Sequence, residues 1–178
     1  KQVAGLVRPF ATTYIPKSRR TIRDNPITVD ATRDQQEGFD RLRNEYWYQS
    51  DCGETLDIKN KPTLIIKCQQ ISDGFLKMGK DGPILRFKSE KLDYCIDKIL
   101  ELVACGERVI VWTAFNESVD IILQQLQRHK QLKGRCYGFT GSRRFDENGW
   151  LKRGLVCVAT ADSGSSVNHF SQVRHAIY

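Results

Sequence analysis

Polar and small side chains follow two apolar runs of the chain, at positions where they could bind a phosphate group. The run Val109–Thr113 is followed by Asn116, and the run Leu155–Thr160 opens into small and hydroxyl-bearing residues. Such runs are typical of buried parallel strands, and open α/β sheets bind ligands at the carboxyl ends of these strands. Hydroxyl, amide and free backbone N–H groups bind phosphate, so Thr113 and Asn116 are candidates. The structural alternative is that Thr113 ends the strand and Asn116 caps the next helix.

A second candidate is the segment Thr140-Gly141-Ser142, because two arginines, Arg143 and Arg144, follow it directly. If a helix begins here, its first backbone N–H groups and the two guanidinium groups would suit a DNA phosphate. The alternative is a turn in which Ser142 caps the helix and both arginines are solvated.

The stretch from Thr160 to Asn168 is the third candidate, since it combines Ala, Gly and Ser residues with an amide side chain. Small residues allow a ligand to approach the backbone, and hydroxyl groups bond phosphate or sugar oxygens. A flexible surface loop is the alternative for its individual serines.

For two further groups of residues, a structural role explains the sequence at least as well as ligand binding does. The basic cluster near the N-terminus is as consistent with a solvated face as with a phosphate-facing patch (Lys17, Arg19, Arg20, Arg23). The aromatic residues 46–48 could stack bases, but their helical spacing favours core packing.

The elements that must position these residues alternate along the chain. Helices are predicted from hydrophobic periodicity and caps, with Thr32 and Ser89 as N-caps and Gly106 closing a helix. The predicted helices span 33–49, 62–75, 90–104, 117–129 and 143–151. The predicted strands span 27–31, 108–112, 136–139, 155–159 and 174–178, and a turn-rich loop covers 78–83. This alternation predicts an α/β fold with a parallel sheet flanked by helices.

Composition narrows the function classes. The chain has 178 residues, 40% hydrophobic and 28% charged, and a formal net charge of +7. This balance is typical of a soluble protein, and no apolar run approaches the roughly 18 residues that a membrane span needs. The six cysteines are scattered without metal-ligand spacing, so we expect reduced thiols, no metal site and no disulfide framework. We therefore expect an intracellular protein without a membrane partner, cytoplasmic, or in the nucleoid or nucleus.

Four motifs, in this order and spacing, carry a resemblance to a known family. They are Lys91-Leu92, the stretch Gly106 to Phe115, Phe139-Thr140-Gly141, and Val156 to Thr160 with Gly164 and Asn168. Together they resemble the second, C-terminal RecA-like lobe of superfamily-two helicases, most closely the Swi/Snf-like group. The match covers residues 87–178, and residues 6–23 and 27–46 are similar to the family more loosely.

The resemblance implies a domain organisation. Residues 1–26 would form a basic entry segment or interlobe linker, and 27–86 a strand with a helical elaboration of the lobe. Residues 87–178 would form the RecA-like lobe, truncated before the family's arginine-finger motif. The chain would then be a fragment of a larger two-lobe protein, with an irregular or helical N-terminal extension.

The resemblance also assigns roles to residues. It implies nucleic-acid backbone contacts for the residues named above (Thr113, Asn116, Thr140, Gly141, Arg143, Arg144, Thr160). It places Gly164 and Asn168 near the cleft that receives ATP. Ser163 and Ser166 stand where the family usually has glycines, which puts the shape of this loop in doubt, since serine adopts positive φ only with strain.

The implied function is that of a motor lobe in an ATP-dependent DNA helicase or translocase. Its partners would be duplex DNA and the N-terminal RecA-like lobe of the same protein. ATP and Mg²⁺ would bind in the two-lobe parent, because this chain has no phosphate-binding loop and no Asp-Glu metal motif. The lobe alone is expected to bind neither cofactor, to contain no catalytic residue and to be inactive. The alternative is a non-catalytic basic α/β module, for nucleic-acid binding or as a scaffold, that keeps the lobe's fold.

Overall fold

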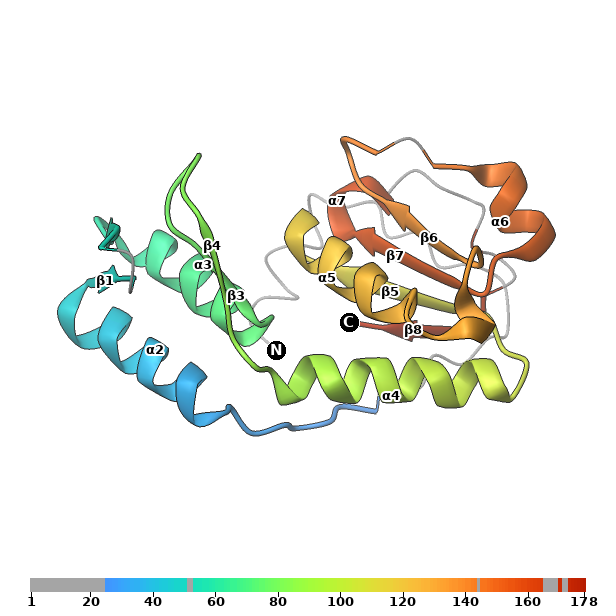
Figure 1. Cartoon of the computed structure of the whole chain (residues 1–178), viewed down its shortest axis with the longest axis horizontal. Coiled ribbons are helices and arrows are strands. Elements are labelled where there is room, and N and C mark those ends of the chain that lie inside the picture. Colours follow the sequence, from blue (N-terminus) through green and yellow to red (C-terminus); the bar gives the residue numbers. More distant parts are fainter. Residues whose placement is uncertain (1–24, 51–52, 144, 165–169, 171–172) are drawn as a thin grey trace, which may run out of the picture.

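The computed structural model describes residues 25–50, 53–143, 145–164, 170 and 173–178. A small unit of two helices and two hairpins comes first along the chain, and a larger unit built on a parallel sheet follows (Figure 1). Helix α4 (Glu90–Ala104) begins between the two units and runs along the larger one.

The small unit opens with α2 (Arg33–Glu45), whose predicted cap is confirmed. The Thr32 side chain accepts a hydrogen bond from Gln35 N, and the Gln35 side chain accepts one from Thr32 N. The predicted strand over 27–31 is wrong, because residues 25–32 have no regular structure. These residues lie in no sheet, and β-propensity alone does not make a strand.

The predicted extension of this helix to Gln49 is also wrong. Tyr46 takes a left-handed conformation with φ 57°, which ends α2. The next residues form β1 (Trp47–Gln49), which pairs antiparallel with β2 (Thr55–Asp57).

A second hairpin completes the small unit after α3 (Lys61–Ser72). Strands β3 (Phe75–Lys77) and β4 (Ile84–Arg86) pair antiparallel around the predicted turn region. The helix predicted to reach Phe75 ends three residues earlier, and Gly74 has φ 85°, a conformation that favours glycine. The buried core of this unit is Leu42, Leu56, Ile58, Ile71, Leu76 and Met78.

Four parallel strands form the sheet of the larger unit, which confirms the predicted α/β class. They are β5 (Val109–Thr113), β6 (Cys136–Phe139), β7 (Val156–Thr160) and β8 (His175–Ile177), in the order β6-β7-β5-β8. The remaining elements are α5 (Asn116–Leu126), a 3₁₀ turn η1 (Lys130–Leu132), α6 (Glu147–Arg153) and α7 (Ala161–Gly164).

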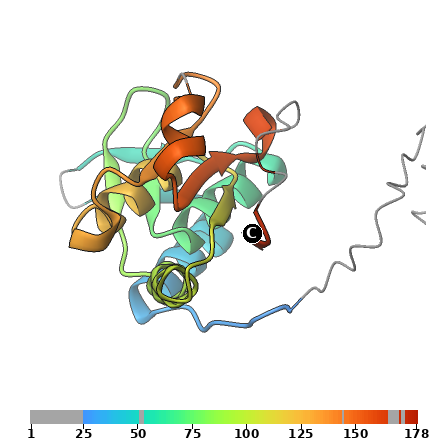
Figure 2. The same ribbon diagram turned by 90° about the vertical axis from the view of Figure 1, so that its right-hand side faces the viewer.

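Side chains of the central strands alternate between two apolar layers. Val109, Val111, Val156 and Val158 pack with α4 and α5, which cover one face of the sheet. Ile110, Cys157 and Ala159 pack on the other face against Trp150 of α6. Figure 2, which looks along α4, shows α6 on the other side of the sheet from α4.

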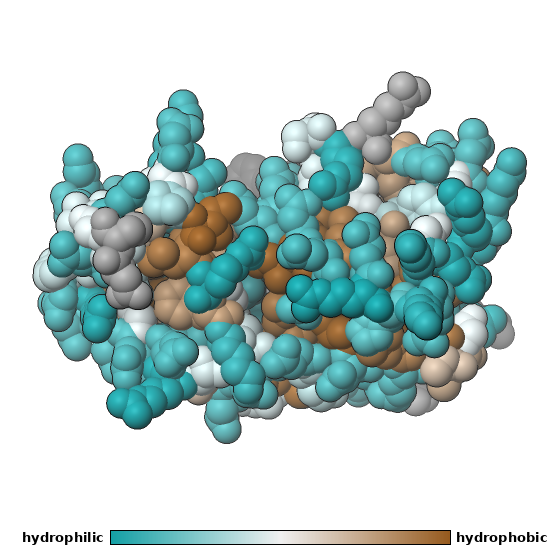
Figure 3. Space-filling model, viewed as in Figure 1, coloured by the Kyte–Doolittle hydropathy of each residue, from teal (hydrophilic) through white to brown (hydrophobic). Residues whose placement is uncertain are grey.

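The exposed face seen in Figure 3 is mainly hydrophilic, with apolar side chains gathered over β3 and β4 and between α4 and α5. Among the described helices, none has both the length and the apolar character that crossing a membrane requires.

Candidate nucleic-acid interface

The connections of the parallel sheet define where a ligand site can form. After β5 the chain crosses by α5 to β6 on one side of β7, whereas after β7 it crosses to β8 on the far side of β5. The neighbouring strands β5 and β7 therefore send their connections in opposite directions. Such a switch point opens a crevice at the carboxyl ends of the strands, where α/β proteins bind ligands.

A pocket of about 440 Å³ lies at this switch point. Three predicted site residues line it, namely Asn116 at the start of α5, Gly141 after β6 and Thr160 at the end of β7. The rest of its lining is Ala114, Phe115, Glu117, Asp162 and Ser163. The sheet thus brings together residues from three of the predicted motifs.

The three threonines lie in a row because of strand register. Thr113 pairs with Thr160, and Phe139 pairs with Ala159, so Thr140 follows at the same level. The Thr113 hydroxyl donates to Phe115 O (3.1 Å), and Thr140 Oγ1 lies 3.2 Å from Ser142 Oγ. Each of these two hydroxyls therefore contacts a residue two positions further along the chain. In this way it holds the loop that follows its strand.

Thr160 is buried, and its hydroxyl lies 2.9 Å from Ser163 Oγ. Ser163 also donates to Phe139 O (3.0 Å) and so joins the loop after β7 to the end of β6. Ser163, where the resemblance predicted a glycine, has a structural role here. It fixes the wall of the pocket.

The segment Thr140 to Ser142 does not begin a helix, contrary to the prediction. It forms a turn closed by a bridge between Thr140 and Arg143, and α6 starts only at Glu147 with Asp146 as its cap. Arg143 is exposed and pairs with Asp120 of α5 at 2.7 Å. The helix N-terminus expected here is therefore absent, and the described part of this segment keeps the Arg143 guanidinium and the turn backbone from the predicted set of groups.

Asn116 is exposed at the first position of α5 rather than at its cap. Phe115 occupies the cap position and provides no side-chain hydrogen bond. The structural alternative for Asn116, a helix cap, is thus wrong. The first N–H groups of a helix lack partners within it, so the Asn116 amide and the backbone of α5 can both face an anion in the pocket.

Three predicted residues are not tested by this geometry. Gly164 is the last residue of α7, directly after pocket-lining Ser163. Arg144 and Asn168 lie outside the described residues.

The sequence analysis missed the carboxylates of the pocket, Glu117 and Asp162. Each stands within five residues of the end of a predicted strand, so position relative to the strand ends could have found both. The Glu117 carboxylate lies 3.5 Å from the ammonium group of Lys77 on β3. The small unit thus reaches a residue that lines the pocket.

Two other contacts join the small unit to the start of α5. The Ser118 hydroxyl donates to Asp73 Oδ2 (2.9 Å), and Asp73 also pairs with Lys91 of α4 (2.6 Å). The ring of Phe75, which is fully buried, meets pocket-lining Phe115 edge to face at 5.6 Å.

The described part of the chain offers no set of three or more His, Cys, Asp or Glu side chains suited to a metal ion. The pocket carboxylate Glu117 is engaged by Lys77. These residues do not fit a resident Mg²⁺ site.

Comparison of the chain with protein-family models, curated proteins and solved structures finds no match.

Proposed function

We propose that this chain is the second RecA-like lobe of a nucleic-acid translocase of the Swi/Snf-like type, and that its pocket contacts the phosphate backbone of duplex DNA. The observation that carries the proposal is the pocket at the switch point between β5 and β7. Residues from three helicase-like motifs (Phe115, Gly141, Thr160) and the predicted contact Asn116 line it. Because fold alone does not imply function, the proposal depends on this site.

The chemistry of the site supports backbone recognition rather than base readout. The pocket presents the Asn116 amide and the first backbone N–H groups of α5, and the turn that contains Gly141 carries Arg143, whose guanidinium pairs with Asp120. Such groups position a protein on phosphates without reading sequence, as a translocase requires. ATP would bind between this lobe and its partner lobe, so the chain supplies one wall of that cleft.

The substitution Asn116→Asp tests the proposal, because it adds a negative charge to the pocket with almost no change in shape. We expect it to weaken binding of a short labelled duplex about threefold or more, measured by fluorescence anisotropy at low salt. Folding stability should not fall, because a carboxylate at a helix N-terminus is favourable.

Gln124→Glu is the matched control, since it adds the same charge at an exposed position on the same helix. It should leave binding nearly unchanged. Equal weakening by both variants would mean that the pocket is not the contact. Failure of the unmodified chain to bind duplex DNA would overturn the proposed function.

A further inference from the structure

The Glu117 side chain is an unexpected component of a phosphate-binding pocket. It lies in the first turn of α5 and lines the pocket, and a quarter of it is exposed. A carboxylate repels a phosphate at this range unless another charge compensates it. The compensating charge comes from outside the sheet unit, from Lys77 on β3.

Hydrogen bonds to its backbone hold Lys77 in place. Its N–H donates to Gln70 Oε1 (3.2 Å), and its carbonyl oxygen accepts from the ammonium group of Lys67 (2.5 Å). Lys67 is buried and also bonds Gln70 Oε1 (3.4 Å). The side chains of α3 therefore hold both polar backbone groups of Lys77.

The charges at this junction compensate the Glu117 carboxylate. Two ammonium groups, from Lys67 and Lys77, lie close to one carboxylate, Glu117. Burial, and then the charge of Lys77, lowers the pKa of Lys67, while Glu117 acts in the opposite direction. Lys77 thus offsets the Glu117 charge at the wall of the pocket.

Two further contacts hold this junction. The hydrogen bond from Ser118 to Asp73 and the contact of Phe75 with Phe115 join the residues on either side of Glu117 to the segment that precedes Lys77. The position of β3 therefore determines where the first turn of α5 lies.

We infer that Lys77 is a positioning residue of the pocket: its ammonium group holds and neutralises the Glu117 carboxylate, one of the two carboxylates that line the pocket with Asp162, so that the small unit lowers the negative charge that a phosphate group meets. The inference rests on the proposed function and deepens it. Lys77 acts through Glu117 and is not itself a ligand of the phosphate.

The test uses Lys77→Gln, Glu117→Gln and the double variant, in the full chain. Inorganic phosphate is the probe, and binding is followed by the NMR shifts of the backbone amides of residues 114–117. Lys77→Gln should weaken phosphate binding about threefold to tenfold, because it leaves Glu117 uncompensated. Adding Glu117→Gln should restore the affinity, and Glu117→Gln alone should bind phosphate at least as tightly as the unmodified chain.

Lys80→Gln is the matched control, since it removes an equal charge from the exposed turn of the same hairpin. It should have little effect. Equal weakening by Lys77→Gln and Lys80→Gln would show a general charge effect and overturn the inference. A double variant as weak as Lys77→Gln would show a merely structural role for Lys77 and overturn it too.

Parallel titrations with duplex DNA separate this inference from the proposed function. If phosphate binding follows the expected order but no duplex binds, the inference stands and the motor-lobe proposal fails. If the duplex binds and Lys77→Gln changes neither ligand, the proposed function stands and the inference fails. Absence of any phosphate effect on the unmodified chain overturns the inference.

Discussion

Individual side chains at the carboxyl edge of the sheet support the site more than they bind its ligand. The hydroxyls of Thr113 and Thr140 contact the loops that follow these residues, and the Thr160 hydroxyl contacts that of Ser163. Hydroxyl groups engaged in this way position a loop. In the proposed site, a phosphate would therefore bind to exposed groups, chiefly Asn116 and the backbone of α5.

One buried and two partly buried thiols make the stability of the chain depend on pH in the alkaline range. Burial raises the pKa of Cys157 from 9.0 to about 12, and that of Cys95 and Cys136 to about 11. The folded state thus holds these protons more tightly than the unfolded chain. The resulting stability is fully present below about pH 9 and is lost as the pH rises towards these folded values.

The substitution Cys157→Ala tests this dependence. Each such thiol should lower the free energy of unfolding by about 1.4 kcal/mol per pH unit above about pH 9. The variant should therefore show a shallower decline than the unmodified chain, measured by urea unfolding across this range. Cys105→Ala, at an exposed thiol, should decline as steeply as the unmodified chain. Parallel curves for all three proteins would contradict the prediction.

Among the elements, the short helix α6 depends on one side chain for its place. Trp150 is 1% exposed and packs on Ile110, Cys157 and Ala159. Its ring meets Tyr137 and Phe170 edge to face, and the Arg108 guanidinium lies over it at 5.7 Å. A helix of seven residues is not stable by itself, so this packing holds α6 on the sheet.

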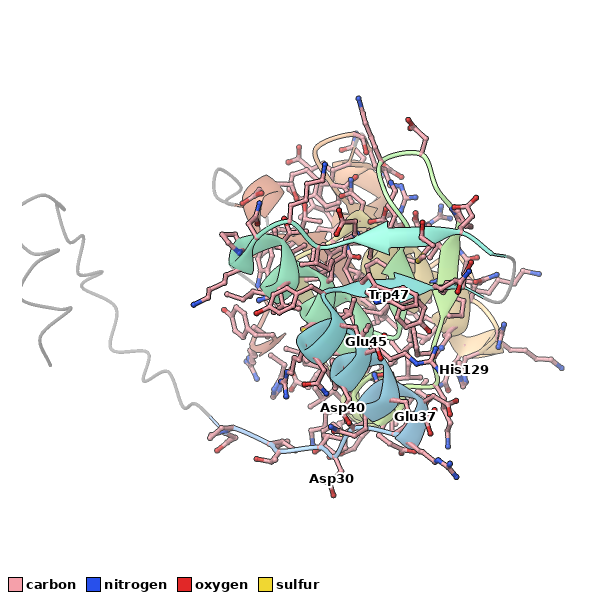
Figure 4. The ribbon with its side chains drawn as sticks, turned by 90° about the vertical axis from the view of Figure 1, so that its left-hand side faces the viewer. Asp30, Glu37, Asp40, Glu45, Trp47 and His129 are labelled. Atoms are coloured by element: carbon pink, nitrogen blue, oxygen red, sulfur yellow. The ribbon has the colours of Figure 1, made fainter. Side chains whose placement is uncertain are left out.

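Trp150→Ala should therefore destabilise the chain by about 3–5 kcal/mol, measured by chemical unfolding. The matched control is Trp47→Ala on β1, whose side chain is 44% exposed, at the end of the molecule away from α6 (Figures 1 and 4). This control should cost under about 1 kcal/mol. Similar losses in the two variants would mean that the Trp150 contacts do not hold α6.

Element boundaries show where local sequence was sufficient. The helix over 90–104 was predicted with its bounds because the Ser89 cap and Gly106 mark both ends. The end of the first helix at Tyr46 was not predicted, because the apolar spacing continues past this residue, whose backbone is left-handed. The hairpin of β3 and β4 was missed because its strands have three residues each, too few for a periodic pattern.

At the scale of the whole molecule, Asp73 provides one of the contacts that join the small unit to the sheet unit. Asp73 ends α3, accepts from Ser118 of α5 and pairs with Lys91 of α4. Its side chain is only 15% exposed, so water replaces these contacts poorly when they are lost.

Asp73→Ala should lower the free energy of unfolding by about 1.5–3 kcal/mol, because hydrogen bonds to a charged group are lost. Urea unfolding followed by circular dichroism measures the change. Asp81→Ala, at an exposed carboxylate in the turn before β4, should cost less than about 0.5 kcal/mol. Equal stabilities of the two variants would show that the units do not depend on Asp73.

Local sequence encodes the alternating strands, the capped helices and thus the α/β class, because side-chain periodicity and cap hydrogen bonds span only a few residues. It also points to the strand ends as the place of the site. Strand order, the switch point and the pocket depend on pairings between distant segments, such as Thr113 with Thr160. Lys77 and Glu117 are forty residues apart in the sequence. Only the fold, which places β3 beside α5, brings the ammonium group to the carboxylate that it compensates.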